Sequence, residues 1–232
     1  MAMIKDNIAR IRGQIAVVCQ RIGRNPDEVT LVVATKYADV EKIKEVIAAG
    51  VGDIGENRVQ DGREKFLKLD AIPHVRRHMI GHLQTNKVKH AVEMFDVIQS
   101  VDSVKLAVEI SKQAVKLNKT IDIFIEVKTS GEEQKSGINS SEAVKLIQDI
   151  SQFSNLHIRG LMTMAPLVDD KSIIRSCFAK LRDVRDQVNA KFHESPNVKM
   201  QFLSMGMSED FEIALEEGSN MVRIGRAIFA EN

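Results

Sequence analysis

The stretch Val29-Thr-Leu-Val-Val-Ala-Thr35 is the most strand-like run in the chain, and a helical pattern over residues 40–49 follows it. Lys36 comes directly after this run. In a barrel of alternating strands and helices, active sites are built where the carboxyl ends of the strands meet. A buried lysine at such an edge can lose its proton and attack a carbonyl to form an imine. The position of Lys36 therefore predicts a carbonyl-binding lysine, with a solvated strand-end residue as the simpler alternative.

The rest of the chain repeats this alternation of strand and helix. Strand-like runs are present at 29–35, 52–56, 77–81, 96–101, 121–128, 157–164, 198–204 and 221–225. Helical patterns lie near 40–49, 58–69, 84–93, 103–118, 140–152, 170–192 and 208–217. Eight such units are typical of a (β/α)8 barrel. The predicted fold class is α/β, a single TIM-type barrel, and a doubly wound open sheet is the alternative.

An amphipathic pattern precedes the first strand and predicts one extra helix. Apolar residues recur at helical spacing over residues 3–22, and Asn25-Pro26-Asp27 then ends the pattern. No linker or shift in composition divides the rest of the chain. We therefore predict one barrel domain over 1–232, with residues 1–25 forming a helix packed outside the barrel.

Composition excludes several classes of function. The 232 residues are 44% hydrophobic and 28% charged, and the net charge of +1 hides no basic block that would indicate nucleic acid or a membrane surface. Cys19 and Cys177 form no CxxC pair, so both are expected to be buried thiols. His78 and His82 fall in a strand-like segment, which disfavours a metal site. The N-terminus lacks a signal-peptide pattern, which predicts a cytoplasmic protein.

Two glycine-containing turns follow the last two predicted strands. They are Ser204-Met-Gly-Met-Ser208 and Arg223-Ile-Gly-Arg226, with a helix expected to begin near Ser208. Barrel enzymes often bind phosphate with the loops at these two positions. Ordinary capping, with Ser208 as an N-cap and Gly225 in a turn, is the alternative for each turn alone. Together with Lys36, they suggest a phosphorylated aldehyde as ligand.

Polar side chains also follow several other strands. They are Glu56, Asn57, Arg58, His82, Gln84, Glu126, Lys128 and Thr163. Polar groups that converge on one barrel mouth are typical of a ligand pocket.

These motifs as a set resemble those of the pyridoxal phosphate homeostasis proteins (the YggS or PROSC family). The family shares the barrel fold of the alanine racemase N-terminal domain. The matching stretches are Val33-Ala-Thr-Lys36, Asp53-Ile-Gly-Glu-Asn57, His78-Met-Ile-Gly-His-Leu-Gln84, Gly160-Leu-Met-Thr163, Leu203-Ser-Met-Gly-Met-Ser208 and Val222-Arg-Ile-Gly225. They extend over nearly the whole chain, and as a set they are specific.

The resemblance implies a cofactor, pyridoxal 5′-phosphate (PLP), and a residue set that holds it. Lys36 would carry PLP as a Schiff base. Arg223 would face the pyridine nitrogen, and Asn57 and Met162 would line the pocket. The phosphate would be held by Ser204, Gly206, Gly225 and the backbone of Arg226.

The resemblance also bears on whether the protein is an enzyme. An arginine at the ring nitrogen leaves that nitrogen unprotonated, which weakens the cofactor as an electron sink. Tyr37, the only tyrosine in the sequence, adjoins Lys36 and is not expected to reach the far face of a substrate, and a β-domain of the racemase type is not expected either. We therefore expect a monomeric carrier that buffers PLP and delivers it to apoenzymes. A weak amino-acid racemase and a Schiff-base aldolase are the alternatives.

Overall fold

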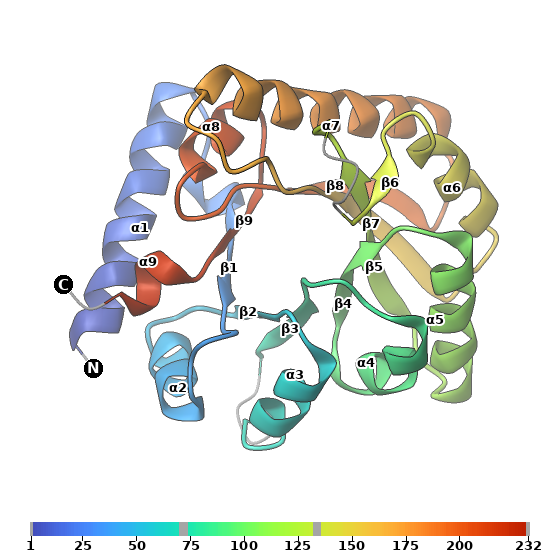
Figure 1. Ribbon diagram of the computed structural model, residues 1–232, viewed down its shortest axis with the longest axis horizontal. Coiled ribbons are helices and arrows are strands. Elements are labelled where there is room, and N and C mark those ends of the chain that lie inside the picture. The colour runs from blue at the N-terminus through green and yellow to red at the C-terminus, as the bar shows by residue number, and fades with distance from the viewer. Residues whose placement is uncertain (1, 70–73, 132–135, 231–232) are drawn as a thin grey trace.

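Eight parallel strands form a closed ring in the computed structural model, which describes residues 2–69, 74–131 and 136–230 (Figure 1). The strands are β1 (Thr30–Ala34), β2 (Asp53–Glu56), β3 (Arg76–Met79), β4 (Val97–Val101), β5 (Ile121–Lys128), β7 (Leu156–Met162), β8 (Val198–Ser204) and β9 (Met221–Ile224). They pair in the order β4-β3-β2-β1-β9-β8-β7-β5, and pairing of β4 with β5 closes the ring. The predicted (β/α)8 barrel is confirmed, and the open sheet is excluded because the described strands leave no open edge in the ring.

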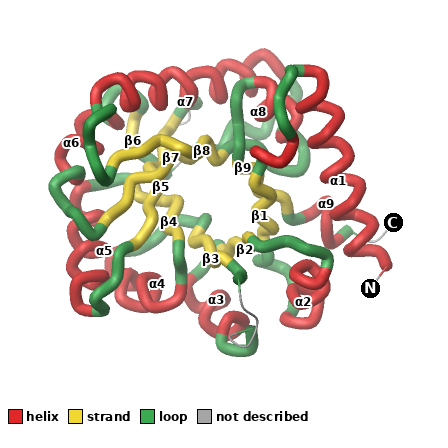
Figure 2. The backbone as a smooth tube through the Cα atoms, turned by 180° about the vertical axis from the view of Figure 1, so that it is seen from behind, coloured by secondary structure: helices red, strands yellow, loops and turns green. Residues whose placement is uncertain are grey.

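Helices surround this ring on all sides (Figure 2). They are α1 (Ala2–Arg21), α2 (Val40–Ala48), α3 (Val59–Phe66), α4 (Val88–Met94), α5 (Val104–Lys116), α6 (Ala143–Ile150), α7 (Lys171–Lys191), α8 (Phe211–Glu216) and α9 (Arg226–Phe229), with 3₁₀ turns η1 (Pro26–Glu28) and η2 (Thr85–Lys87). Side-chain caps fix several of the starts: Asp39 accepts from the Lys42 amide at 2.8 Å, and Ser103 accepts from the Leu106 amide at 3.4 Å.

Two details differ from the sequence-based expectation. Helix α8 begins at Phe211 and not near Ser208, because the Met207 amide donates to the Asp210 carboxylate and forms a turn there first. A two-residue strand, β6 (Ile138–Asn139), pairs with the end of β5 and was not predicted. The sequence also predicts a glycine-bounded, charged loop over 129–137 and a last turn of helix over 227–232, and both segments lie partly outside the described residues.

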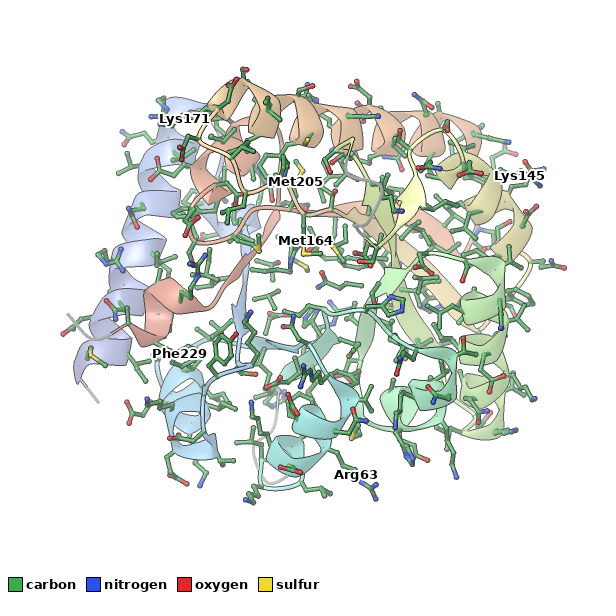
Figure 3. All side chains as sticks on the ribbon, viewed as in Figure 1. Arg63, Lys145, Met164, Lys171, Met205 and Phe229 are labelled. Carbon is green, nitrogen blue, oxygen red and sulfur yellow. The ribbon has the colours of Figure 1, made fainter. Side chains whose placement is uncertain are left out.

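The interior of the barrel has an apolar layer. Val32, Val97, Phe124, Met162 and Met221 pack together inside the ring, and the Phe124 ring stacks on Phe202 with centroids 5.6 Å apart. Met164, labelled in Figure 3, packs on this cluster from the segment after β7. Most of the other buried apolar side chains fill the space between strands and helices, as expected when a sheet is buried on both faces.

The N-terminal helix covers one side of the barrel. Its predicted stripe of Ile4, Ile8, Ile11, Ile15 and Val18 is buried against β1, α2, α8 and α9. The side chain of Asn7 donates to the carbonyls of Ile228 and Ala230 at 3.1 and 3.2 Å, which ties α9 to α1. The N-terminal segment thus supports the loop that follows the last strand.

The two cysteines, Cys19 and Cys177, are buried and not disulfide-bonded, as expected. Within the described segments, no helix has both the length and the apolar character needed to span a membrane.

A glycine allows the close approach of β7 to β8. A Cβ added at Gly160 would lie 2.4 Å from the carbonyl oxygen of Phe202, at a point where the register between the two strands shifts. Backbone atoms cannot move away without breaking the ladder, so any larger residue forces the strands apart.

We expect Gly160→Ala to lower the free energy of unfolding by about 1–3 kcal/mol, the range seen for overpacked interiors. Gly13→Ala is the control, because a Cβ at Gly13 on α1 would meet nothing within 4 Å. Chemical denaturation of both variants measures the difference, and equal stabilities would contradict the close-approach argument.

Candidate functional site

Lys36 lies at the mouth of the barrel, between two neighbouring loops. Parallel pairing brings Ala34 level with Gly55 on β2 and Val33 level with Ile224 on β9. Extending these registers places Lys36 level with Asn57 on one side and with the start of α9 on the other. Three of the predicted site segments therefore meet at Lys36.

The structure corrects one part of the prediction for Lys36. The side chain is exposed rather than buried, and its Nζ lies 4.7 Å from the centroid of the Tyr37 ring. The Tyr37 side chain is itself 80% exposed. The amine is therefore open to reagents that arrive from solution.

A second lysine fixes the backbone that carries Lys36. Lys65 Nζ donates to the Thr35 carbonyl at 2.8 Å and to Glu56 Oε1 at 2.7 Å. The Thr35 hydroxyl donates to the same carboxylate oxygen at 2.6 Å. Glu56 is fully buried, so this ion pair is shielded from solvent and holds the end of β1 in place. Lys65 was not predicted from the sequence, although its spacing of nine residues from Glu56 places it on the facing helix.

Asn57 stands beside a hollow that the next loop helps to form. A Cβ added at Gly81 would lie 2.3 Å from the Asn57 carbonyl oxygen, so only glycine lets the loop after β3 rest on this residue. Asn57 lines a hollow of about 660 Å³ together with Arg58, His82 and Lys87. The predicted polar residues after β2 and β3 are thus brought together.

Arg223 is buried in the barrel, and acceptors from two strands surround it. Its Nη1 donates to the carbonyl oxygen and the hydroxyl of Ser204, both at 2.7 Å, and its Nη2 donates to the Thr163 carbonyl at 2.9 Å. Burial lowers the pKa of Arg223 to about 10, against the opposing effect of the nearby Asp210 and Glu126 carboxylates. The guanidinium is therefore charged at neutral pH. Among the described residues, three of its five N–H groups have an acceptor.

The phosphate role predicted for Ser204 is not supported by its geometry. Its side chain is completely buried, accepts from Arg223, and donates its only O–H to Gln99 at 2.6 Å. No donor is left for a phosphate oxygen. The sequence could not separate Ser204 from Ser208, because both are serines of the same short turn.

Ser208 is more accessible to a phosphate than Ser204. It is half-buried, and its Oγ lies 3.4 Å from the amide of Ala227 in the first turn of α9. The amides at the start of a helix have no carbonyl partner within it. The Ala227 amide is one of these, and its donation to Ser208 ties the turn after β8 to the start of α9.

Two glycines shape this part of the mouth. Gly206 has φ +96°, and a Cβ there would lie 2.7 Å from that of Ala214. A Cβ at Gly225 would lie 3.0 Å from the Ala34 carbonyl, so β9 approaches β1 closely just below Lys36. Arg226 has an exposed side chain, paired with Glu209 at 2.9 Å. It lines a second hollow, of about 340 Å³.

Glu126 and Met162 complete the wall opposite Lys36. Strand pairing places Glu126 level with Met162, and Met162 level with Ser204. Burial raises the pKa of Glu126, against the opposing effect of its hydrogen bond from Ser136. Its Oε2 is buried and has no hydrogen-bond partner among the described residues.

The two histidines of the third strand region lie in different surroundings. His78 is fully buried inside the barrel, where its Nε2 lies 2.8 Å from Asp53 Oδ1 and its Nδ1 lies 2.9 Å from Gln99 Nε2. His82 is exposed at the mouth. No cluster of three or more metal-binding side chains occurs in the described ranges.

Comparison with known proteins gives close relatives over the full length. Residues 7–232 match the family described as alanine racemase, N-terminal domain. The chain is 38% identical to the pyridoxal phosphate homeostasis protein of Aquifex aeolicus over 97% of each sequence. It is 34% identical to the protein of the same name from Pseudomonas aeruginosa, over 99% of this chain and 96% of that one.

Solved structures agree with this relationship. PipY of Synechococcus elongatus, solved with PLP bound, has a TM-score of 0.87 and 32% identity, over 98% of this chain and all of that one. An alanine racemase of Clostridium difficile 630 has a TM-score of 0.80 at 14% identity, and this chain spans 57% of it. That likeness concerns the fold alone.

We expect His78 to make stability depend on pH. Burial lowers the pKa of His78, against the opposing effect of Asp53, so the folded state holds the ring neutral while the unfolded state titrates near 6.5. The stabilising contribution is present above that pH and decreases as the pH falls towards the folded pKa, with a slope of at most about 1.4 kcal/mol per pH unit.

Denaturation of wild type and His78→Gln between pH 7.5 and 5 measures the free energy of unfolding. This free energy should decline less steeply with falling pH in the variant than in wild type. His193→Gln is the matched control, since the His193 side chain is 71% exposed. A wild-type slope retained in His78→Gln would contradict the expectation.

Proposed function

The chain belongs to the pyridoxal phosphate homeostasis protein family, and we propose that it holds PLP reversibly on Lys36 and so contributes to cellular PLP homeostasis. The observation that carries the proposal is the convergence on Lys36. Asn57 follows β2, whereas Arg223 and the start of α9 both belong to the last strand–helix unit, and β2 and β9 flank the strand that carries Lys36. The proposal further rests on the PLP that PipY binds.

The aldehyde of PLP condenses with a primary amine, losing water and forming a Schiff base. Lys36 supplies that amine, and its exposure allows the cofactor to enter and leave. The contacts of Lys65 and Glu56 with Thr35 hold the lysine backbone in one place, so the aldehyde meets the amine in a defined position.

The phosphate is assigned to the turn after β8 and the start of α9. Ser208 supplies a hydroxyl, and Gly206, Gly225 and the backbone of Arg226 allow close approach of the chain to an anion. Ser204 acts on this phosphate site indirectly, through its hydrogen bond with Arg223, and not by direct contact with phosphate. Asn57 lines the space between phosphate and lysine, whereas Met162, predicted to line it as well, is fully buried in the apolar layer of the barrel.

Arg223 is assigned to the ring nitrogen. Its pKa of about 10 keeps it a hydrogen-bond donor at neutral pH, so the nitrogen that it contacts remains unprotonated. Such a ring withdraws electrons weakly from a substrate carbanion. Tyr37 stacks against Lys36 on the same segment, so it does not serve as a second base on the opposite face. We therefore assign this protein a carrier role without strong catalysis.

The carrier role accounts for the exposed lysine. A cofactor held at an open mouth can be taken up when it is abundant and released to apoenzymes in the cytoplasm. All of the proposed contacts come from one chain, so a monomer is sufficient for binding.

Incubation of the purified protein with PLP should produce a yellow species. After borohydride reduction, peptide mass mapping should locate the adduct on Lys36, and Lys36→Ala should remain colourless. The physical reason is that reduction converts a reversible imine into a stable secondary amine at the residue that formed it.

Lys44→Ala, which removes an exposed lysine on the adjacent helix α2, is the control and should behave as wild type. A wild-type protein that stays unmodified, or an adduct spread over many surface lysines, would overturn the proposal.

A test of catalysis separates a carrier from a racemase. We expect no exchange of the α-proton for deuterium when the PLP-loaded protein is incubated in heavy water with a panel of amino acids, because the site has one amine and a weak electron sink. Proton NMR measures the exchange. Exchange that is present in wild type and absent in Lys36→Ala would instead establish the racemase alternative.

A further inference from the structure

A line of hydrogen bonds crosses the barrel interior beneath the proposed cofactor site. Arg223 Nη1 contacts Ser204 Oγ at 2.7 Å, and Ser204 Oγ contacts Gln99 Oε1 at 2.6 Å. Gln99 Nε2 lies 2.9 Å from His78 Nδ1, and His78 Nε2 lies 2.8 Å from Asp53 Oδ1. Five side chains from β9, β8, β4, β3 and β2 thus connect a cation at the mouth to a carboxylate on β2.

The charged groups at the two ends of this line determine which group donates and which accepts in each of its hydrogen bonds. The guanidinium can only donate, so Ser204 accepts from it and gives its own proton to Gln99 Oε1. The amide of Gln99 then presents its N–H to His78, whose Nδ1 accepts. The other ring nitrogen of His78 carries the proton and donates to Asp53. All four bonds therefore point from the cation towards the anion, the arrangement in which neighbouring bonds polarise one another.

The stability of the barrel alone does not explain this line. The layer around it is apolar, formed by Val32, Val97, Phe124, Met162 and Met221, and a methionine at position 99 would fill similar space. Polar groups buried there need partners, because an unpartnered one costs free energy. Of the line's members, Gln99, His78 and Ser204 are fully buried. The amide of Gln99 therefore matters through its hydrogen bonds to Ser204 and His78.

We propose that Gln99 and His78 are positioning residues for Arg223: through Ser204 they fix the orientation in which the guanidinium meets the ring nitrogen of the bound cofactor. The inference rests on the proposed function, since it concerns how that cofactor is contacted. It assigns a role to two residues that touch neither Lys36 nor the proposed phosphate site. The sequence contains a hint of it, since Gln99 interrupts the otherwise apolar start of β4.

The test compares Gln99→Met with wild type, both loaded with PLP. Methionine keeps the length of the side chain and removes its hydrogen bonds to Ser204 and His78, together with the weaker one to the Met221 sulfur. We expect the PLP dissociation constant to rise about 2- to 10-fold, the effect of losing one hydrogen bond. We also expect a shift in the absorption spectrum of the bound cofactor and in the pH at which it changes. A merely structural residue would leave the spectrum unmoved.

Gln113→Met is the matched control. Gln113 is also buried and hydrogen-bonded to two side chains, Glu109 and Lys116, but it lies on α5 outside the barrel. It should keep the wild-type spectrum and affinity. Thermal unfolding of both variants establishes that they are folded at the temperature of measurement.

Ser204→Ala keeps the inference testable if Gln99→Met proves unstable. Ser204→Ala cuts the line between Gln99 and Arg223 by removing one oxygen, so it should produce a similar spectral shift. Because both changes act through one hydrogen bond, the combination should have less than the sum of the two single effects. Ser111→Ala, which removes a buried hydroxyl on α5, is the control for that substitution.

The outcomes are distinguishable. One outcome overturns this inference alone: the wild-type protein binds PLP on Lys36, and both Gln99→Met and Ser204→Ala keep the wild-type spectrum and affinity. Fully additive effects of the two changes also overturn it. Wild-type protein that forms no adduct overturns the proposed function, and the inference with it.

Discussion

Burial of the Arg223 charge is the constraint on which the mouth of the barrel depends. A guanidinium removed from water is tolerated only when acceptors surround it. Here the acceptors are the Thr163 carbonyl and both oxygens of Ser204, at the ends of β7 and β8. The carboxylates of Glu126 and Asp210 add compensating charge. The positions of four strand ends are therefore linked to a single side chain.

The barrel interior divides into two layers with different tasks. The apolar layer of Phe124, Met162 and their neighbours closes the ring by packing. The polar line from Asp53 to Arg223 gives the interior a fixed electrostatic direction. Above both layers, Lys36 stays exposed on a backbone that Lys65 and Glu56 hold in place. The protein thus combines rigid walls with an accessible amine, as reversible binding of a reactive aldehyde requires.

Local patterns were sufficient to predict the eight barrel strands and the helices between them. Alternation of short apolar runs with amphipathic segments is a property of neighbouring residues, so it can be seen in one sequence. The errors occurred where a contact across the fold decides the outcome. The bond between Met207 and Asp210 delays the start of α8, and pairing with β5 creates β6 from two residues without a strong pattern. The exposure of Lys36 likewise depends on its surroundings, which its neighbours in sequence do not reveal.

The candidate site shows the same division. The barrel, the lysine at the end of its first strand, the two glycine turns and, through resemblance, the family could all be predicted from the amino-acid sequence. The difference in burial between Ser204 and Ser208 became evident only in the folded chain. The tertiary structure also joined Gln99 and His78 to Arg223, and Lys65 to the backbone beside Lys36. The physical reason is that a hydrogen bond depends on distance and direction between groups far apart in the chain. Those quantities exist only after the ring of strands has closed.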